Sequence, residues 1–224
     1  MITAAYTPDG IVLATLSIDT YYEMTQIGNM DSLSPIHVKG HQHYKVFWNK
    51  YAIVFRHMSS YSYDTILLNK FCTYEIEHQE SIPDVVSFVN DIQSIINDTK
   101  SDIVSILAGY NDTEPYVYYI QGKDLRRINV TDKNEIIYNC QYVERNEVIG
   151  RVFRDIKLRN GDKWEERDGL RTRCDLYSTE KAIDLCKFML HTNFYANNIN
   201  IMTFEFQLPY EIVVIKNNKV EFLK

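Results

Sequence analysis

Glycine and proline are scarce in this sequence of 224 residues, which contains only 8 Gly and 5 Pro. Interdomain linkers and low-complexity segments are usually rich in these residues, so we expect no such linker here. No apolar run approaches the ~20 residues that a membrane-spanning helix needs. The length allows one large domain or two small ones and the burial of a sizeable core, and the composition predicts no membrane span.

Runs of lysine and arginine are also absent, and the formal net charge is -6. Proteins that bind nucleic acids over a broad surface carry clustered basic residues, so we expect no nucleic-acid partner. The first residues, MITAAYTPDG, contain no basic segment followed by a long apolar one, which a secretory signal needs. We therefore expect a cytoplasmic protein.

Cysteine is rare and irregularly spaced, which bears on metal and disulfide chemistry. Cys72, Cys140, Cys174 and Cys186 form no CxxC pair, so reduced cytosolic thiols are the simplest interpretation. The sequence also lacks a GxGxxG motif and a P-loop, which excludes the nucleotide-binding classes that depend on them. We expect no cofactor.

Strand signals dominate both ends of the chain. Two apolar runs, residues 2–7 and 11–16, flank the turn formed by Pro8, Asp9 and Gly10, which predicts a hairpin. Residues 17–43 are polar and predict short strands and loops. The further predicted strands are 45–48, 51–55 (after a turn at Asn49 and Lys50), 103–110, 116–121, 125–130, 135–142, 199–206, 211–215 and 220–223, the last two joined by a turn at Asn217 and Asn218.

Helical spacing of apolar residues appears between these runs. It predicts helices over 64–78, 83–97 and 179–195, and more weakly over 144–158. Ser81 and Ser178 are expected to cap the second and third of these helices. Residues 159–177 are charged and predict a surface loop. Because strands and helices are segregated along the chain, we expect an α+β fold in which two antiparallel sheets lie between helix layers.

Three stretches, in order, resemble the proteasome family. They are Asp-Gly-Ile-Val-Leu-Ala at 9–14, Ile-Leu-Ala-Gly-Tyr-Asn-Asp at 106–112 followed by Pro-Tyr-Val-Tyr-Tyr-Ile at 115–120, and the pair of runs 209–215 and 220–223, with a helix signal before it at 178–185. The chain is thereby similar to proteasome-type subunits of the N-terminal-nucleophile (Ntn) hydrolases, most of all to the catalytic (beta) type. The resemblance implies a single domain over residues 1–224 that folds as a four-layer αββα sandwich. Residues 140–177 diverge from the family.

The resemblance also implies where catalytic groups would lie. In that family an N-terminal Thr attacks the peptide carbonyl, its own α-amine serves as the base, and a Lys and an Asp support it. Here the nucleophile position falls on or just before Met1, the Asp position falls at Leu16 or Ser17, and the Lys position falls near Lys45. Met1, Ser17 and Lys45 are therefore candidates for a degenerate site. Thr3 becomes a candidate nucleophile only if the chain is cleaved after Ile2.

Three histidines, His37, His41 and His43, have the spacing H-x3-H-x-H. Imidazoles spaced in this way can bind zinc, but no fourth ligand stands out. We interpret them as polar surface residues and expect no metal.

These observations predict a proteasome-like protein without the nucleophile, which acts as a non-catalytic structural or interaction subunit. The resemblance implies assembly through the helical layers, as a homo-oligomer or with related subunits, and another protein partner is an alternative. Two other functions stay open. One is a threonine peptidase or amidase that is active only after processing to Thr3, and the other is a peptide- or ligand-binding module that uses the old cleft.

Overall fold

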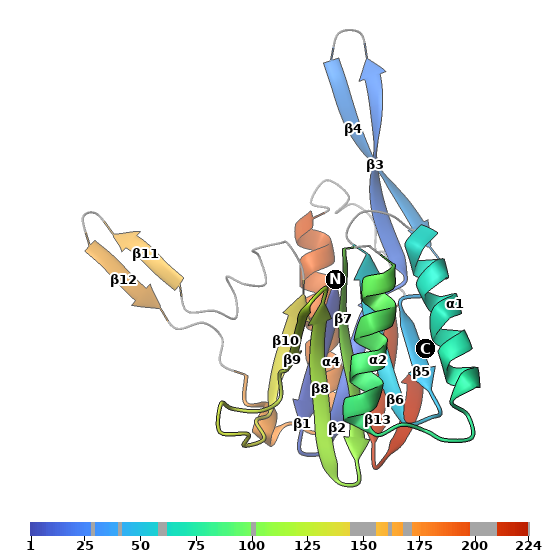
Figure 1. Cartoon of the computed structure of the whole chain (residues 1–224). Coiled ribbons are helices and arrows are strands. Elements are labelled where there is room, and N and C mark those ends of the chain that lie inside the picture. Colours follow the sequence, from blue (N-terminus) through green and yellow to red (C-terminus); the bar gives the residue numbers. More distant parts are fainter. Residues whose placement is uncertain are drawn as a thin grey trace.

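The computed structural model describes residues 1–27, 30–39, 42–57, 62–99, 102–143, 156–160, 163–167, 172–197 and 210–223. Its largest elements are two antiparallel sheets of five strands each (Figure 1). Sheet I contains, in spatial order, β10 (Asn139–Val143), β1 (Ile2–Thr7), β2 (Gly10–Leu16), β13 (Tyr210–Lys216) and β14 (Lys219–Leu223). Sheet II contains β5 (Tyr44–Phe47), β6 (Tyr51–His57), β7 (Ile103–Asn111), β8 (Glu114–Gln121) and β9 (Asp124–Arg127).

Helices lie against the outer face of each sheet. α1 (Ser62–Glu77) and α2 (Val85–Asp98) cover sheet II, and α4 (Thr179–Asn197), preceded by the short 3-10 helix η1 (Cys174–Leu176), covers sheet I (Figure 1). Two further ribbons each pair with no other described strand: β3 (Ile18–Ile27) with β4 (Met30–Lys39), and β11 (Ile156–Asn160) with β12 (Lys163–Arg167).

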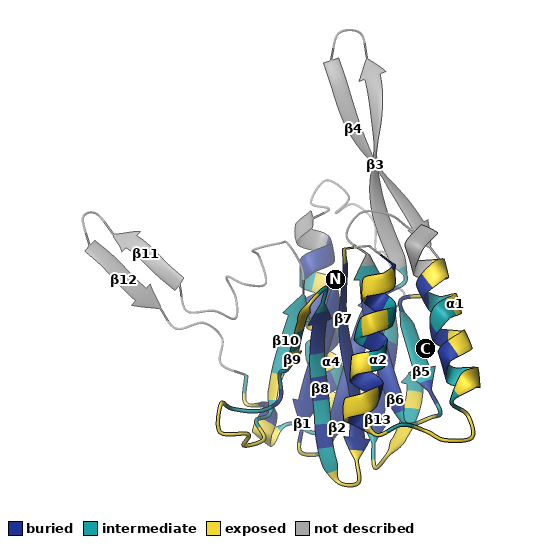
Figure 2. Ribbon diagram, in the orientation of Figure 1, coloured by how far each residue is buried: buried dark blue, intermediate teal, exposed yellow. Residues whose placement is uncertain are grey.

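The core divides into three clusters because side chains alternate across each strand. The inward faces of the two sheets pack on each other through residues such as Leu13, Val54 and Ile106. On the other face of sheet I, Val12 and Ala14 pack against Met189 of α4. Figure 2 shows that the buried residues concentrate on the central strands, and β1 and β2 are buried along their whole length.

The four-layer αββα sandwich expected from the sequence is wrong. The structure is mostly β, with two five-stranded sheets and three α-helices among the residues that it describes. A helical layer over sheet I would need more than one helix, but the single helix α4 contacts mainly the central strands β1, β2 and β13. Part of the helix expected over 144–158 lies outside the described residues, and its last residues, from Ile156 on, begin strand β11.

Individual elements agree better with the sequence. The hairpins β1–β2 and β13–β14 and the helices α1, α2 and α4 are confirmed within a few residues. The segment 17–43, expected to be irregular, instead contains the long ribbon β3–β4, and the charged segment 159–177 contains β12 and η1. The strand expected over 199–206 lies outside the described residues.

The cap of α2 differs from the expected one. The Asp84 side chain, rather than Ser81, accepts hydrogen bonds from the backbone N–H groups of Val86 and Ser87, at 2.9 and 3.1 Å. An aspartate at this position also interacts favourably with the helix dipole. For α4, the Ser178 hydroxyl accepts a hydrogen bond from Lys181 N–H, as expected.

Gly109 on β7 is required by the aromatic ring that covers it. Its strand partner is Tyr51, and a methyl group at position 109 would overlap the Cδ1 and Cε1 atoms of that ring. The ring cannot easily retreat, because it stacks on Phe88 of α2 at 4.7 Å between centroids. The ring of Tyr51 thus fills the space that the missing side chain leaves, and it joins sheet II to α2.

We expect Gly109→Ala to destabilise the protein by roughly 1–3 kcal/mol, because the core around Tyr51 would be overpacked. Urea unfolding followed by circular dichroism measures this change. Combining it with Tyr51→Leu removes the clash, so the double variant should lose less stability than the sum of the two single variants. Strictly additive losses would contradict this explanation.

Asp9, in the turn between β1 and β2, connects this hairpin to the start of α4 and to the end of β13. One carboxylate oxygen accepts hydrogen bonds from the backbone N–H and the hydroxyl of Thr179, at 3.2 and 2.7 Å, and the other pairs with Lys216 Nζ at 2.6 Å. These contacts, first that of Lys216 and then those of Thr179, lower the pKa of Asp9 to about 2. The negative charge also lies at the N-terminal end of α4, where the helix dipole favours it.

The pH dependence of stability follows from the sign of this shift. Because folding lowers the pKa of Asp9, its contribution is fully present above its unfolded value near 4 and is lost as the pH falls towards 2. We expect Asp9→Asn to lower the urea midpoint at pH 7, and the difference from wild type to shrink between pH 4 and pH 2. The exposed Asp132→Asn variant is the control, and at pH 7 it should unfold at nearly the wild-type urea midpoint.

Candidate functional site

The residues that the resemblance assigned to hydrolysis lie just before β1, just after β2 and on β5. Met1 is buried in the cluster between sheet I and α4, and its carbonyl accepts a hydrogen bond from the Thr15 hydroxyl at 3.2 Å. Lys45 lies on β5, and its Nζ pairs with Glu75 Oε2 of α1 at 2.5 Å. Both sheets therefore lie between the Met1 and Lys45 side chains. Ser17 follows β2 in a bend and is partly buried.

Thr3 lies in the middle of β1, paired with Ala14 on one side and Tyr142 on the other. Its side chain is fully buried, and its hydroxyl donates to the Ala14 carbonyl at 3.4 Å. A free amino group at Thr3 would require removal of Met1 and Ile2, whose side chains fill the clusters on the two faces of sheet I. A nucleophilic Thr3 stays a prediction.

Lys45 has a structural role in the contact between sheet II and α1. Glu75 accepts from Lys45 with one oxygen and from the backbone N–H of Trp48 with the other, at 2.7 Å, while Trp48 Nε1–H donates to the Glu75 carbonyl at 3.1 Å. Trp48 and Asn49 both have positive φ, 46° and 54°, in the tight turn between β5 and β6. A bulky residue rarely adopts this backbone conformation, so Glu75 stabilises a strained turn.

The three histidines are not gathered into a described metal site. His37 pairs with Thr20 in the β3–β4 ladder, and His41 lies outside the described residues. His43 is buried rather than on the surface, and its Nδ1–H donates to the Leu16 carbonyl at 3.2 Å while its backbone N–H donates to Glu211. In the part of the chain that the structure describes, no group of three or more His, Cys, Asp or Glu side chains could hold a metal ion.

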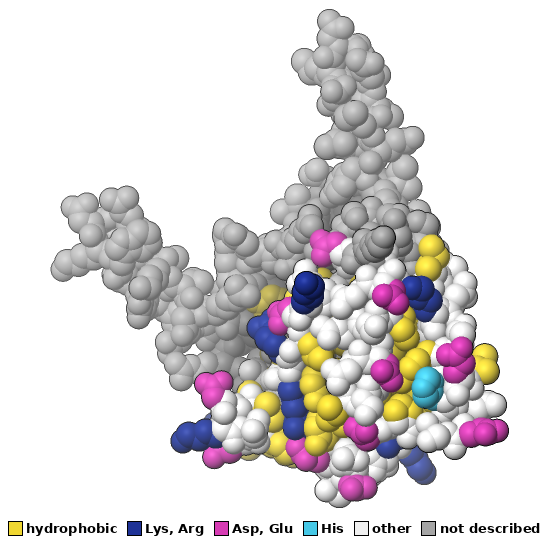
Figure 3. Space-filling view, in the orientation of Figure 1, with side chains coloured by type: hydrophobic (Ala, Val, Ile, Leu, Met, Phe, Trp, Pro, Cys, Tyr) yellow, Lys and Arg dark blue, Asp and Glu magenta, His cyan; other side chains and the backbone are white. Residues whose placement is uncertain are grey.

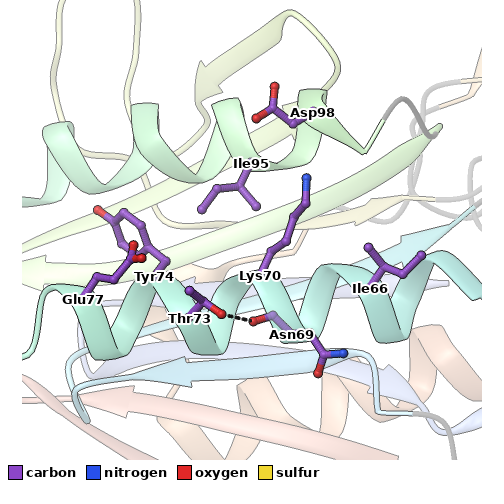
Figure 4. Close-up of a pocket in the computed structure, with 8 residues that line it drawn as sticks. All are labelled: Ile66, Asn69, Lys70, Thr73, Tyr74, Glu77, Ile95 and Asp98. Atoms are coloured by element: carbon purple, nitrogen blue, oxygen red, sulfur yellow. Dashed lines mark hydrogen bonds between the residues drawn. The ribbon is translucent and has the colours of Figure 1, made fainter.

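A groove that the sequence analysis did not single out lies between α1 and α2. Its volume is about 470 Å³, and it is open to solvent over much of its length. Figure 4 shows its lining, which comes from α1 except for Ile95 and Asp98 of α2. The lining residues are Ile66, Asn69, Lys70, Thr73, Tyr74, Glu77, Ile95 and Asp98.

Apolar residues extend from this groove over the neighbouring surface. Figure 3 shows hydrophobic side chains gathered between α1 and α2, with single charged residues around them. Four of the eight large apolar side chains that are exposed in the described residues lie on α1, on α2 or in the segment between them: Ile66, Ile76, Ile82 and Val86. Exposed apolar surface with a polar rim is typical of a protein interaction site.

A signal for this surface was present in the sequence. Leu67, Phe71 and Tyr74 follow the i, i+4, i+7 spacing of one helix face, and all three are buried. Ile66 and Ile76 are rotated about 100° or more from that face at ~3.6 residues per turn, so they cannot pack on the same sheet. Their positions alone predict an α1 that is apolar outside as well as inside.

The charges in the groove are not used within the described structure. Lys70 and Glu77 of α1 and Asp98 of α2 form no ion pair with one another or with another described residue. Unpaired charges of both signs beside an apolar groove are available to a binding partner.

Comparison of the chain with models of known protein families and with curated proteins gives no match. The resemblance to proteasome-type subunits thus stays a prediction from three sequence stretches. Among the described helices, none is long and apolar enough to cross a membrane.

We expect Glu75→Gln to destabilise the protein by about 1–3 kcal/mol, because Lys45 would stay largely buried without a counter-charge. Urea unfolding measures the loss. The double variant Lys45→Met/Glu75→Gln removes the unpaired charge and should recover part of the stability. A double variant as unstable as the sum of its parts would contradict the proposed pairing.

Proposed function

We propose that the protein is a non-catalytic interaction protein that self-associates through the outer face of α1 and α2. The observation that carries this proposal is the apolar groove between these helices. Its charged residues Lys70, Glu77 and Asp98 form no ion pair with a described residue. The non-catalytic part is supported by the contacts of Met1 and Lys45, which occupy separate structural clusters on opposite sides of the two sheets.

The apolar part of the surface supplies a driving force for association. Ile66 and Ile76 are 47% and 65% exposed, and Val86 at the start of α2 is 52% exposed. Each side chain of this size gains roughly 1.5–3 kcal/mol when it is fully buried. Only a few of these residues need to be covered for an interface core to form, with the charged residues at its rim.

The charges favour a second copy of this chain as the partner. Lys70 and Glu77 are two helical turns apart on the same face of α1, and Thr73 lies between them. A twofold axis beside Thr73 would place two α1 helices antiparallel. Lys70 of each copy would then face Glu77 of the other, which is the self-complementary arrangement that a twofold interface requires. A partner of one charge sign would leave either the lysine or the acidic residues uncompensated.

We expect the wild-type protein to self-associate reversibly, and Ile66→Glu to weaken this association at least about tenfold by placing an unpaired charge in the interface. Sedimentation velocity over a concentration series measures the association. Phe188→Glu is the matched control, because Phe188 is also 47% exposed but lies on α4, on the opposite side of the molecule. This variant should associate as wild type does.

The same assay tests whether Lys70 of one copy faces Glu77 of the other. Lys70→Glu and Glu77→Lys should each weaken association, and the double variant Lys70→Glu/Glu77→Lys should restore it, because each pair would again join opposite charges across the twofold axis. A protein that stays monomeric at all concentrations would overturn self-association. Association that Phe188→Glu disrupts and Ile66→Glu does not would assign the interface to the α4 face instead.

A further inference from the structure

Three of the four thiols lie near the α4 side of sheet I. Cys140 is on the edge strand β10, Cys174 is in η1 and Cys186 is on α4. Cys174 and Cys186 are buried, whereas Cys140 is partly exposed, and the fourth thiol, Cys72, is exposed on α1 at the other side of the molecule. All four are reduced. The edge strand thus gives solvent access to one member of a cluster that is otherwise closed.

Cys140 and Cys174 are neighbours. The Thr172 hydroxyl lies 3.6 Å from Cys140 Sγ, and the thiol of Cys174, two residues further along the chain, interacts with that of Cys140. The contact follows from the fold, because η1 packs against β1 and β10 and so presents Cys174 to the edge of sheet I. Thiols on two segments that pack against each other in this way can form a disulfide with little movement of the backbone.

The two thiols differ in acidity, and this difference indicates which of them reacts first. The interaction with Cys174, supported by the hydrogen bond with Thr172, lowers the pKa of Cys140 below its usual value although burial opposes the shift. The same interaction and burial raise the pKa of Cys174 above its usual value. Cys140 is therefore the thiol that ionises more readily, and Cys174 is the one that keeps its proton.

We propose that Cys140 and Cys174 form an oxidisable dithiol that reacts with hydroperoxides and closes to an intramolecular disulfide. The Cys140 thiolate attacks a peroxide oxygen, the O–O bond breaks, and the products are a sulfenic acid at Cys140 and hydroxide or alkoxide. The Cys174 sulfur then attacks the Cys140 sulfur, the S–O bond breaks, and the departing hydroxide takes the Cys174 proton as water. Overall, two thiols are oxidised by two electrons while one peroxide is reduced.

The other two thiols are poor alternatives. Burial raises the pKa of Cys186 to about 12 although a hydrogen bond with the Thr3 side chain opposes the shift, so Cys186 stays protonated. Cys72 has solvent access but lies on the far side of sheet II from the three other cysteines. Only Cys140 combines partial exposure with a neighbouring thiol and a lowered pKa.

Oxidation would link the edge strand β10 covalently to η1. Cys140 and Cys174 lie at the two ends of the segment 141–173, which contains the ribbon β11–β12. A disulfide between them would fix both ends of this segment to the edge of sheet I. It would also cross-link the unfolded chain and lower its conformational entropy, which raises the thermal stability of the protein.

The test treats the full chain carrying Cys72→Ser with hydrogen peroxide, blocks the remaining thiols with a maleimide and measures the intact mass and the peptide map. We expect a loss of about 2 Da, reversible by dithiothreitol, with Cys140 and Cys174 in one disulfide-linked peptide. Adding Cys140→Ser should abolish the disulfide. Adding Cys174→Ser should instead leave a sulfenic acid at Cys140, which dimedone labels.

A second readout guards against variants that fold poorly. The melting temperature of the Cys72→Ser protein should rise on oxidation and fall back on reduction, and it should not respond to peroxide when Cys140→Ser is added. If Cys174→Ser fails to fold, Cys174→Ala takes its place with the same expected labelling at Cys140. The proposal is overturned if both thiols stay open to maleimide at peroxide concentrations that oxidise Cys72 in the wild type, or if the disulfide joins Cys186 or a second chain.

Discussion

Burial of the β1–β2 hairpin on both of its faces is the constraint on which the other elements depend. Every residue of these two strands is buried, which is unusual for an antiparallel pair. One face needs sheet II, and the other needs α4. Asp9 connects the hairpin to the start of that helix and to the end of β13, so the turn, the helix and the neighbouring strand are held together. The apolar surface that the hairpin must bury thus decides where the second sheet and α4 lie.

Helices α1 and α2 cover sheet II, and they leave apolar side chains exposed on their outer face. The aromatic cluster around Tyr51 and Phe88 joins the sheet to α2, while Glu75 ties α1 to the strained turn at Trp48. Both contacts fix the inner faces of the helices and leave Ile66, Ile76 and Lys70 facing outward. The proposed self-association follows from this division, because α1 carries more apolar surface than one sheet can bury.

The candidate catalytic residues illustrate how packing assigns roles that a family pattern does not. Lys45 was singled out for its position in the chain, yet in the fold it neutralises Glu75 beneath α1. Thr3 faces the α4 side and shares a hydrogen bond with the Cys186 thiol. The Cys140–Cys174 pair, by contrast, has no spacing signal, since 33 residues separate the two thiols along the chain. Only the docking of η1 against the edge strand brings them into contact.

The sequence by itself determined the local elements. The turn chemistry at Asp9-Gly10 and at Asn217-Asn218, and the apolar spacing in 83–97 and 179–195, identified two hairpins and two helices, because these signals depend on residues close together in the chain. The ribbon β3–β4 was missed because its residues are polar and lack a clean alternation. Which sheet each strand joins, which helix covers which face, and which cysteines meet were decided by the tertiary structure, because these contacts join residues far apart in the sequence and depend on shape and burial rather than on local pattern.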